Sequence, residues 1–204
     1  MLNKQTTRTG RRPGPPATRE AILAAAREAF TGSGYRAATI RAIAANAGVD
    51  PSLVMHFFGS KEALFVEAVR PPVDISEVVA GALHADLESA GATIVSFLLE
   101  VWESDAHHRA LLALVRAAVN EEAAAAMFRR AILGGVTTAF EGYGLDEPGR
   151  RAALVVSQLI GLAISRYVVA LEPVAAAPRP WVAAAIAPTI QRYISGPLPA
   201  EEER

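Results

Sequence analysis

The chain has 204 residues, of which 51% are hydrophobic and 20% are charged, so it can bury a core and wholesale disorder is excluded. It contains no cysteine, which excludes disulfides, thiolate metal sites and cysteine nucleophiles, and its four histidines are too few and too scattered to predict a metal centre. Charge is unevenly distributed along the chain. Residues 1–61 hold nine Lys or Arg and three acidic residues, whereas residues 62–204 hold 11 Lys or Arg and 18 acidic residues.

Residues 1–17 form a basic segment rich in proline and glycine, which predicts a flexible arm. Residues 1–20 are polar and contain no apolar run, so they do not have the pattern of a secretory signal. We therefore expect the protein to be cytoplasmic.

Two helices are predicted after the arm. Thr18 is a suitable N-cap for a helix whose apolar residues recur with a helical period, and Gly32 and Gly34 should end it. Thr39 should cap a second helix, in which apolar residues fall at i, i+3, i+4 and i+7, and Gly48 should end that helix.

A short third helix and a fourth helix should follow directly. Asp50 can accept hydrogen bonds from free backbone amides and Pro51 suits the first helical position, so the third helix should run to about Phe57. Gly59 should end it, and Ser60 should cap the fourth helix.

The second and third helices have the sequence pattern of a helix-turn-helix. Two helices joined by a tight turn approach closely at the corner, where Ala44 offers a small side chain and Gly48 permits left-handed backbone geometry. The residues that should pack the two helices together are Val49, Val54 and either Phe57 or Phe58. The basic charge of this part of the chain favours a polyanionic partner, through steering and counterion release.

Pro71-Pro72 should separate a helix-turn-helix domain at residues 18–70 from a second helical domain at residues 73–196, which an acidic tail at 197–204 follows. Helices of the second domain are predicted at 75–87, 90–104, 106–119, 121–142, 148–171 and 179–195. Gly134-Gly135 should kink or break one of them, and Ala175–Ala177 should be a loop. Both domains are therefore expected to be all-α.

A set of motifs occurs in order over about residues 18–70. They are a glycine after the first helix, the run Thr-Ile-Arg-x-Ile-Ala, the turn Ala-Gly-Val and the exit Phe-x-Ser-Lys-Glu-x-Leu. This set resembles the TetR-type bacterial transcriptional regulators. The resemblance implies an all-α homodimer with a three-helix DNA-binding head and a variable helical body. It also implies that the body dimerises through its last two long helices and binds a small molecule, which releases the operator.

The resemblance implies DNA contacts for particular residues. Thr39 and Lys61, each at the start of a helix, should hold backbone phosphates. The third helix should present four side chains to the major groove, and two further residues complete the implied set: Ser52, Leu53, Met55 and His56, with Arg41 and Phe57. The family usually has Tyr in place of Met55 and His in place of Phe57, so apolar contact with thymine methyl groups is the expected substitute.

The basic arm offers Arg11 and Arg12, which could enter the minor groove beside the helix-turn-helix site. The alternative is a solubilising tail that makes no DNA contact. Charge alone is consistent with both roles.

Six residues of the second domain are candidates for effector binding: Phe97, Trp102, His107, Phe128, Gln158 and Arg166. The aromatic ones would wall a cavity and the polar ones would orient a partly apolar ligand. Ordinary core packing is the alternative for the aromatic residues. The polar residues could equally face water or pair across a dimer interface.

The segment 152–171 has the length of a membrane span, but Arg166 interrupts it, and a central charge is costly in lipid. We therefore expect a helix buried between protein surfaces. Ser157, Gly161 and Ser165 recur at four-residue spacing. This row would let a partner helix approach, either at a dimer interface shared with 179–195 or within one subunit.

The sequence contains no recognisable catalytic arrangement and no cofactor motif, so we predict neither enzymatic activity nor a cofactor. The predicted function is that of a dimeric, ligand-released transcriptional repressor acting on a near-palindromic operator. One alternative is a helical scaffolding module whose head binds proteins. Another is a constitutive DNA binder without an effector.

Overall fold

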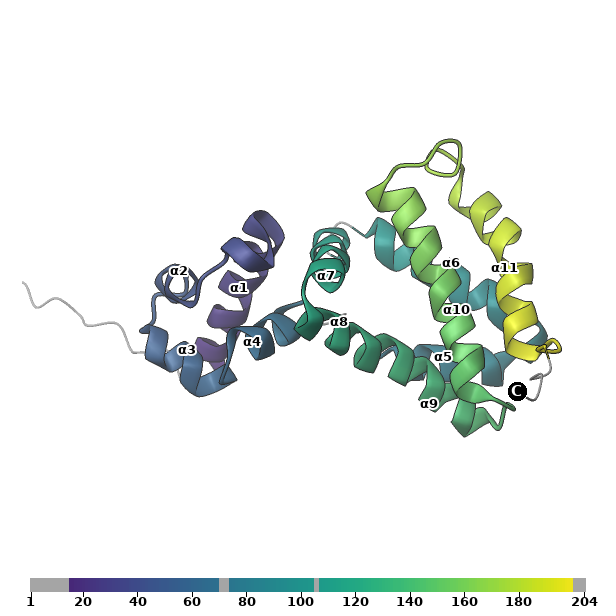
Figure 1. Ribbon diagram of the computed structural model, residues 1–204, viewed down its shortest axis with the longest axis horizontal. Helices are drawn as coiled ribbons and strands as arrows, with labels where there is room; N and C mark the ends of the chain where they lie inside the picture. The colour runs from purple at the N-terminus through teal and green to yellow at the C-terminus, as the bar shows by residue number, and fades with distance from the viewer. Residues whose placement is uncertain (1–14, 70–73, 105–106, 200–204) are drawn as a thin grey trace, which may run out of the picture. The chain divides into compact units, whose positions relative to one another are not determined.

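The computed structural model describes residues 15–69, 74–104 and 107–199, and the regular elements in these ranges are all helical (Figure 1). The predicted all-α fold is confirmed. The chain divides into two compact units, Met1–Ala68 (unit 1) and Val69–Arg204 (unit 2). Pro71-Pro72, predicted as the domain boundary, lies outside the described residues.

The described part of unit 1 contains α1 (Pro15–Ala37), α2 (Ile40–Asn46), α3 (Pro51–Phe58) and α4 (Lys61–Ala68). The first of these departs from the prediction at both ends. Thr18 lies inside its first turn instead of capping it, because proline is well accommodated at the start of a helix, where amides have no intrahelical partner. The helix also continues past Gly32 and is interrupted at Gly34 (φ 80°, ψ 166°), a backbone conformation that favours glycine.

The caps predicted for the other three helices of unit 1 are confirmed. The side-chain oxygens of Thr39, Asp50 and Ser60 each accept a hydrogen bond from a nearby backbone amide, at 3.1, 2.8 and 3.0 Å. Gly48 and Gly59 follow α2 and α3 with φ values of 68° and 75°. These left-handed residues turn the chain sharply at both ends of α3, as a helix-turn-helix requires.

Apolar side chains from all four helices form the core of unit 1. Its largest fully buried members are Phe30, Phe65, Ile22, Ile43, Leu64 and Val54. The rings of Phe30 and Tyr35 each contact Phe65 edge-on, with centroids 4.9 Å apart. Of the two candidates for packing α3, Phe58 is buried, whereas Phe57 is half-buried. The buried face of α3 is thereby defined.

Unit 2 begins with α5 (Ile75–Ala85), the short turn η1 (Leu87–Ser89), α6 (Ala90–Glu103) and α7 (His108–Asn120). It continues with α8 (Glu122–Phe128), η2 (Arg129–Leu133), α9 (Gly134–Tyr143), α10 (Pro148–Ala163), η3 (Ile164–Val168) and α11 (Arg179–Ser195). The helices predicted at 75–87, 90–104 and 179–195 agree with α5, α6 and α11 to within two residues at each end. Ala175–Ala177 lies in turns, as predicted.

The segment predicted as one helix over 121–142 is divided by the π-helical turn η2. The predicted break at Gly134-Gly135 is therefore wrong in position, because α9 begins at Gly134 and runs through both glycines. Gly135 instead allows close packing, since an added Cβ would lie 3.4 Å from the Ser76 amide nitrogen and 3.5 Å from Cβ of Ile75. A second π-helical turn, η3, ends α10.

Helices α6 and α11 of unit 2 approach each other closely at Gly91. An added Cβ on Gly91 would lie 2.8 Å from the Gln191 amide nitrogen and 2.9 Å from the Ala187 carbonyl oxygen. The Gln191 side chain bridges the crossing, because its Oε1 accepts from the Gly91 amide at 2.8 Å and its Nε2 donates to the Leu87 carbonyl at 2.7 Å. A glycine is therefore required at position 91, because a side chain there would keep α6 and α11 apart.

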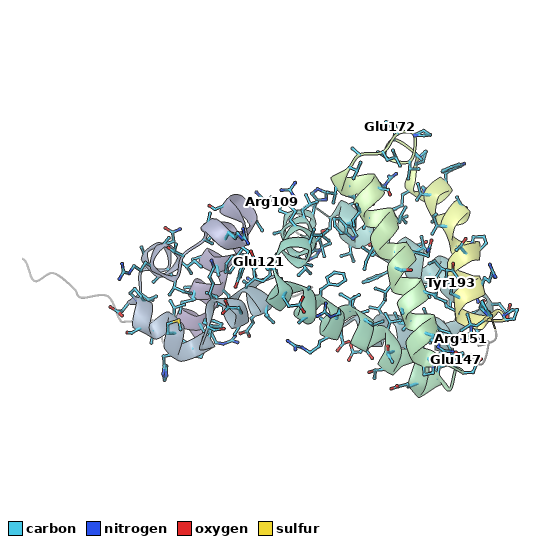
Figure 2. All side chains as sticks on the ribbon, in the orientation of Figure 1. Arg109, Glu121, Glu147, Arg151, Glu172 and Tyr193 are labelled. Atoms are coloured by element: carbon cyan, nitrogen blue, oxygen red, sulfur yellow. The ribbon has the colours of Figure 1, made fainter. Side chains whose placement is uncertain are left out.

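Arg151 in the first turns of α10 is buried, with 4% of its surface exposed, and it holds the end of α11 (Figure 2). Its Nη2 donates to the Asp146 carboxylate at 2.8 Å. Its Nη1 donates to the carbonyl oxygens of Tyr193 and Gly196, both at 2.9 Å. Nε donates to the Asp146 carbonyl at 2.9 Å, so each guanidinium nitrogen has an acceptor.

Replacing Arg151 with methionine should lower the free energy of unfolding by about 2–4 kcal/mol, since three carbonyls and one carboxylate lose their donor. Arg150→Met is the matched control, because the ion pair of Arg150 with Glu147 lies on the surface. The control should cost less than about 1 kcal/mol. Urea unfolding of both variants measures the difference, and equal losses would contradict a structural role for the buried guanidinium.

The stretch Pro148–Val168 is long and apolar enough to cross a membrane by length and composition alone. In the structure, Ala152, Val155 and Val156 of this stretch belong to the core of unit 2. The core helix of a protein without membrane spans can pass the same test of length and composition. One face of the stretch packs into unit 2, whereas Ser157, Gln158 and Gly161 are exposed, so burial between two protein surfaces stays a prediction.

Candidate nucleic-acid interface and ligand cavity

One face of α3 packs into unit 1 and the other is open. Val54 and Phe58 are buried. Ser52, Met55 and His56 are exposed, with 43% of the Met55 surface accessible. A helix anchored on one side, with side chains free on the other, can enter a DNA groove while its domain stays folded.

Leu53 and Phe57 are half-buried, so they border the open face of α3 and do not project from it. The rings of Phe57 and His56 are in contact, with centroids 5.7 Å apart. Phe57 therefore supports the imidazole of His56 from one side. Both residues were predicted to face DNA, and the structure gives the exposed position to His56.

Ser52 takes part in the cap of α3. The Asp50 carboxylate accepts from the Ser52 hydroxyl at 2.6 Å and from the Ser52 amide at 2.8 Å. These two bonds, the hydroxyl first and the amide second, lower the pKa of Asp50. The carboxylate is therefore charged at neutral pH beside the positive end of the helix dipole. The Ser52 hydroxyl uses its proton in this bond, which leaves its oxygen to accept.

The predicted phosphate contacts lie at helix starts. Thr39 is exposed and uses its oxygen to cap α2, so its hydroxyl proton can be donated outward. Arg41 is exposed in the first turn of α2. The Lys61 ammonium, at the start of α4, donates to the Arg36 carbonyl at 3.3 Å and lies 4.5 Å from the centre of the Tyr35 ring. An ammonium has three donors, so these contacts leave Lys61 able to bind a phosphate.

Arg11 and Arg12 of the predicted arm lie outside the described residues. The candidate DNA-binding face is therefore defined on α2, α3 and the start of α4. We call it the α3 surface, and its exposed or half-buried members are Thr39, Arg41, Ser52, Met55, His56 and Lys61.

Unit 2 contains a cavity of about 110 Å³ between α5, α6, α7, the α8–α9 segment and α10. We call it the apolar cavity, because its described lining consists of aliphatic side chains, phenylalanine and tryptophan. Representative members are Val79, Phe97, Trp102, Leu114, Phe128 and Leu159. Of the described residues that line it, none is charged.

Trp102 lines both the apolar cavity and a second recess, which is open to solvent. The other residues that line this polar recess are Glu103, His108, Arg109 and Tyr167. The Trp102 and Tyr167 rings are stacked, with centroids 5.1 Å apart and planes inclined by 2°. Nδ1 of His108 donates to the Trp102 carbonyl at 2.9 Å. Burial raises the pKa of Tyr167 to about 12, so its hydroxyl stays protonated and donates to Glu103 at 3.1 Å.

The three aromatic residues predicted to wall an effector site, Phe97, Trp102 and Phe128, all line the apolar cavity. Two of the polar candidates do not. Gln158 is exposed on α10, and His107 lies just before α7, outside both the cavity and the recess. Neither residue therefore lines the cavity in the structure, and their role in effector binding stays a prediction.

Arg166, the third polar candidate, does not line the cavity either. Its Nη1 donates to the carbonyls of Val174 and Ala177 at 2.5 and 2.8 Å. Its Nη2 donates to Glu103 at 3.1 Å. The guanidinium therefore holds the connection between α10 and α11, and does not line the apolar cavity.

The sequence does not single out the aliphatic walls of the cavity. Val79, Leu114 and Leu159 recur with the period of any core-facing helix, so periodicity cannot distinguish a cavity wall from solid packing. His108 and Tyr167 contact Trp102 because α6, α7 and η3 meet in the fold. The sequence alone does not indicate that these residues lie together.

Comparison with known families finds a match in each of the two units. Residues 22–68 match the family described as bacterial regulatory proteins, tetR family. Residues 88–194 match the family described as tetracyclin repressor-like, C-terminal domain.

Individual relatives agree with these matches. The HTH-type transcriptional regulator BetI of Rhizobium meliloti (strain 1021) is 42% identical over 55 residues, which span 27% of each chain. The crystal structure of a TetR-family regulator from Streptomyces coelicolor A3 has 35% sequence identity and a TM-score of 0.63, covering 92% of this chain and 99% of that one. The structure of the multidrug binding protein EbrR complexed with proflavin shares the fold, with a TM-score of 0.60, 21% identity, and coverage of 87% and 99%.

Proposed function

This chain belongs to the TetR family of bacterial transcriptional regulators, and from this premise we propose how it acts. It binds a near-palindromic DNA operator as a homodimer and represses transcription in the cytoplasm. It leaves the operator when a small molecule occupies the apolar cavity. It has no enzymatic activity and needs no cofactor.

The observation that carries the proposal is the open face of α3. Met55 and His56 project from a helix that Val54 and Phe58 anchor, so the side chains can reach base edges in the major groove. Met55 would contact thymine methyl groups, and His56 would hydrogen-bond to bases or to phosphates. Ser52 would accept a hydrogen bond, since its proton is held by Asp50.

Phosphate contacts would fix the orientation of α3 on the duplex. Thr39 and Lys61 stand at helix starts, where side-chain donors and free backbone amides act on one anion together. Arg41 supplies a further positive charge. We also propose that Arg11 and Arg12 enter the neighbouring minor groove.

The homodimer would form through α10 and α11. Ser157 and Gly161 are small and exposed on α10, so a partner helix can approach them closely. Trp181 on α11 is 60% exposed, and burial against a partner would remove this large apolar surface from water. The two-fold axis would set the two copies of α3 about 34 Å apart, one turn of DNA.

The apolar cavity would make the regulator responsive to a ligand. The fold relative EbrR was solved in complex with proflavin, which supports small-molecule binding by a chain of this fold. A ligand can release DNA only if it binds the DNA-free form more tightly than the DNA-bound form. The effector site is thus proposed in unit 2, apart from the α3 surface.

Selection of duplex DNA from a fragmented bacterial genome tests the proposal. The full-length protein should retain fragments that share one near-palindromic sequence, with affinity falling steeply as salt rises because phosphate counterions are released. A scaffolding module would retain no such set. A constitutive binder would retain it but would not respond to any ligand of unit 2.

A further inference from the structure

The walls of the apolar cavity offer no partner for a charge. We infer that its ligand is a neutral, compact and apolar molecule about the size of one ring, and that charged ligands are excluded. The inference deepens the proposed function and rests on it for the regulatory meaning of binding.

The first argument is the cost of burying a charge. An ionised group loses its hydration on entering an apolar site, and the loss is recovered only by a counter-charge or several hydrogen bonds. The described lining supplies neither, and the cationic residue among the predicted candidates, Arg166, is bonded to two loop carbonyls and Glu103. A cation or an anion would therefore bind far more weakly than a neutral molecule of the same shape.

The second argument is size. The cavity measures about 110 Å³. An engineered apolar cavity of about 150 Å³ in another protein stays dry and binds benzene, so a cavity on this scale fits a single ring. The rings of Phe97, Phe128 and Trp102 in the wall favour an aromatic guest, which can contact their edges and faces.

The third argument is that Trp102 lies at the border between the apolar cavity and the polar recess. Trp102 lines both spaces and is stacked on Tyr167, and Nδ1 of His108 donates to its backbone carbonyl. A charged head that crossed this border toward Arg109 or Glu103 would have to displace the stacked pair. The arrangement therefore favours a guest without a charged head.

The test uses three near-isosteric probes with the full-length protein: toluene, benzylammonium and benzoate. Calorimetric titration at neutral pH should detect toluene, with both ions binding at least about 100-fold more weakly. Toluene should also raise the midpoint of thermal unfolding, because it binds only the folded state.

Ala163→Leu locates the binding. Ala163 is buried and lines the cavity, so the larger side chain should fill it and abolish the toluene signal. Ala92→Leu is the control, since Ala92 is exposed on α6, and it should bind toluene as the parent does. If Ala163→Leu does not fold, by circular dichroism, Ala163→Val provides a smaller insertion with a weaker block.

Binding of either ion with affinity equal to that of toluene would overturn the inference. So would toluene binding that survives Ala163→Leu, or the absence of toluene binding to the parent. Operator binding is measured on the same samples. Loss of the ligand selectivity with operator binding intact would count against this inference alone, whereas failure to bind any operator would count against the proposed function.

Discussion

Replacing Met55 and His56 together with glutamate should weaken operator binding by at least about 100-fold, because two carboxylates would enter a groove flanked by phosphates. Both side chains are exposed on α3, and neither belongs to the core of unit 1. Val54 and Phe58 would keep the helix in place. Thermal unfolding should therefore change little while the affinity measured by fluorescence anisotropy collapses.

The control for charge is the double variant Ala92→Glu with Val119→Glu. Both residues are exposed in unit 2, so the control changes the net charge equally without placing a carboxylate on α3. Its operator affinity should fall by less than about threefold at physiological salt, because exposed charges that are not on the α3 surface are screened by salt. Similar losses in the two double variants would mean that α3 makes no special contribution.

Gly91→Ala should destabilise unit 2 by about 3 kcal/mol or more, one of the larger effects expected of a single methyl group. The new Cβ would lie within 3.0 Å of three backbone atoms of α11, at Ala187 and Gln191. Backbone atoms cannot rotate away as a flexible side chain can. The two helices would have to separate, which would also stretch the hydrogen bonds of the Gln191 side chain.

Gly81→Ala is the matched control in α5. An added Cβ at Gly81 meets nothing within 4 Å, and the residue lies inside a helix. The Gly81→Ala variant should be more stable than the parent by about 0.5–1 kcal/mol, because alanine loses less backbone entropy on folding than glycine does. Chemical unfolding of both variants provides the comparison. A Gly91→Ala variant as stable as Gly81→Ala would show that the α6–α11 crossing tolerates a wider spacing.

Gly91→Ala should also affect dimerisation. Because α11 is proposed to form the dimer interface, the variant should shift toward monomer in sedimentation experiments. Operator affinity would then fall although the α3 surface is unchanged. The two glycine variants therefore link the packing of unit 2 to DNA binding.

The sequence predicts the local structure of unit 1 well where short-range chemistry decides it. Asp50, Pro51 and Gly59 specify the limits of α3 because a cap, a fixed φ and a left-handed turn act within a few residues. The start of α1 is predicted less well, since Thr18 and Pro15 both suit a helix N-terminus and the structure begins the helix at Pro15.

Long-range packing explains what the sequence leaves open. The choice between Phe57 and Phe58 depends on the rotation of α3 against its neighbours, which no local pattern fixes. The requirement for glycine at position 91 depends on a residue 100 positions later, Gln191. The buried Arg151 likewise binds Tyr193 and Gly196, which lie far along the chain.

The same difference between short-range and long-range determinants applies to the candidate sites. Of the α3 residues that the family resemblance implies for DNA contact, Ser52, Met55 and His56 are exposed. The apolar cavity depends on the π-helical turn η2 and on how α5, α6, α7 and α10 meet, and an aliphatic wall has the same periodicity as a filled core. Polar residues such as Arg166 attract attention in the sequence, yet here the guanidinium stabilises a loop.

The most direct test of how α3 is used is protection of guanine N7 from methylation on a selected operator. N7 lies in the major groove, so the protein should protect two clusters of guanines on one side of the duplex, about 34 Å apart. The variant with glutamate at both Met55 and His56 should lose this protection. Absence of N7 protection on an operator that the protein still binds, or one cluster alone, would contradict a dimer that places two copies of α3 in successive major grooves.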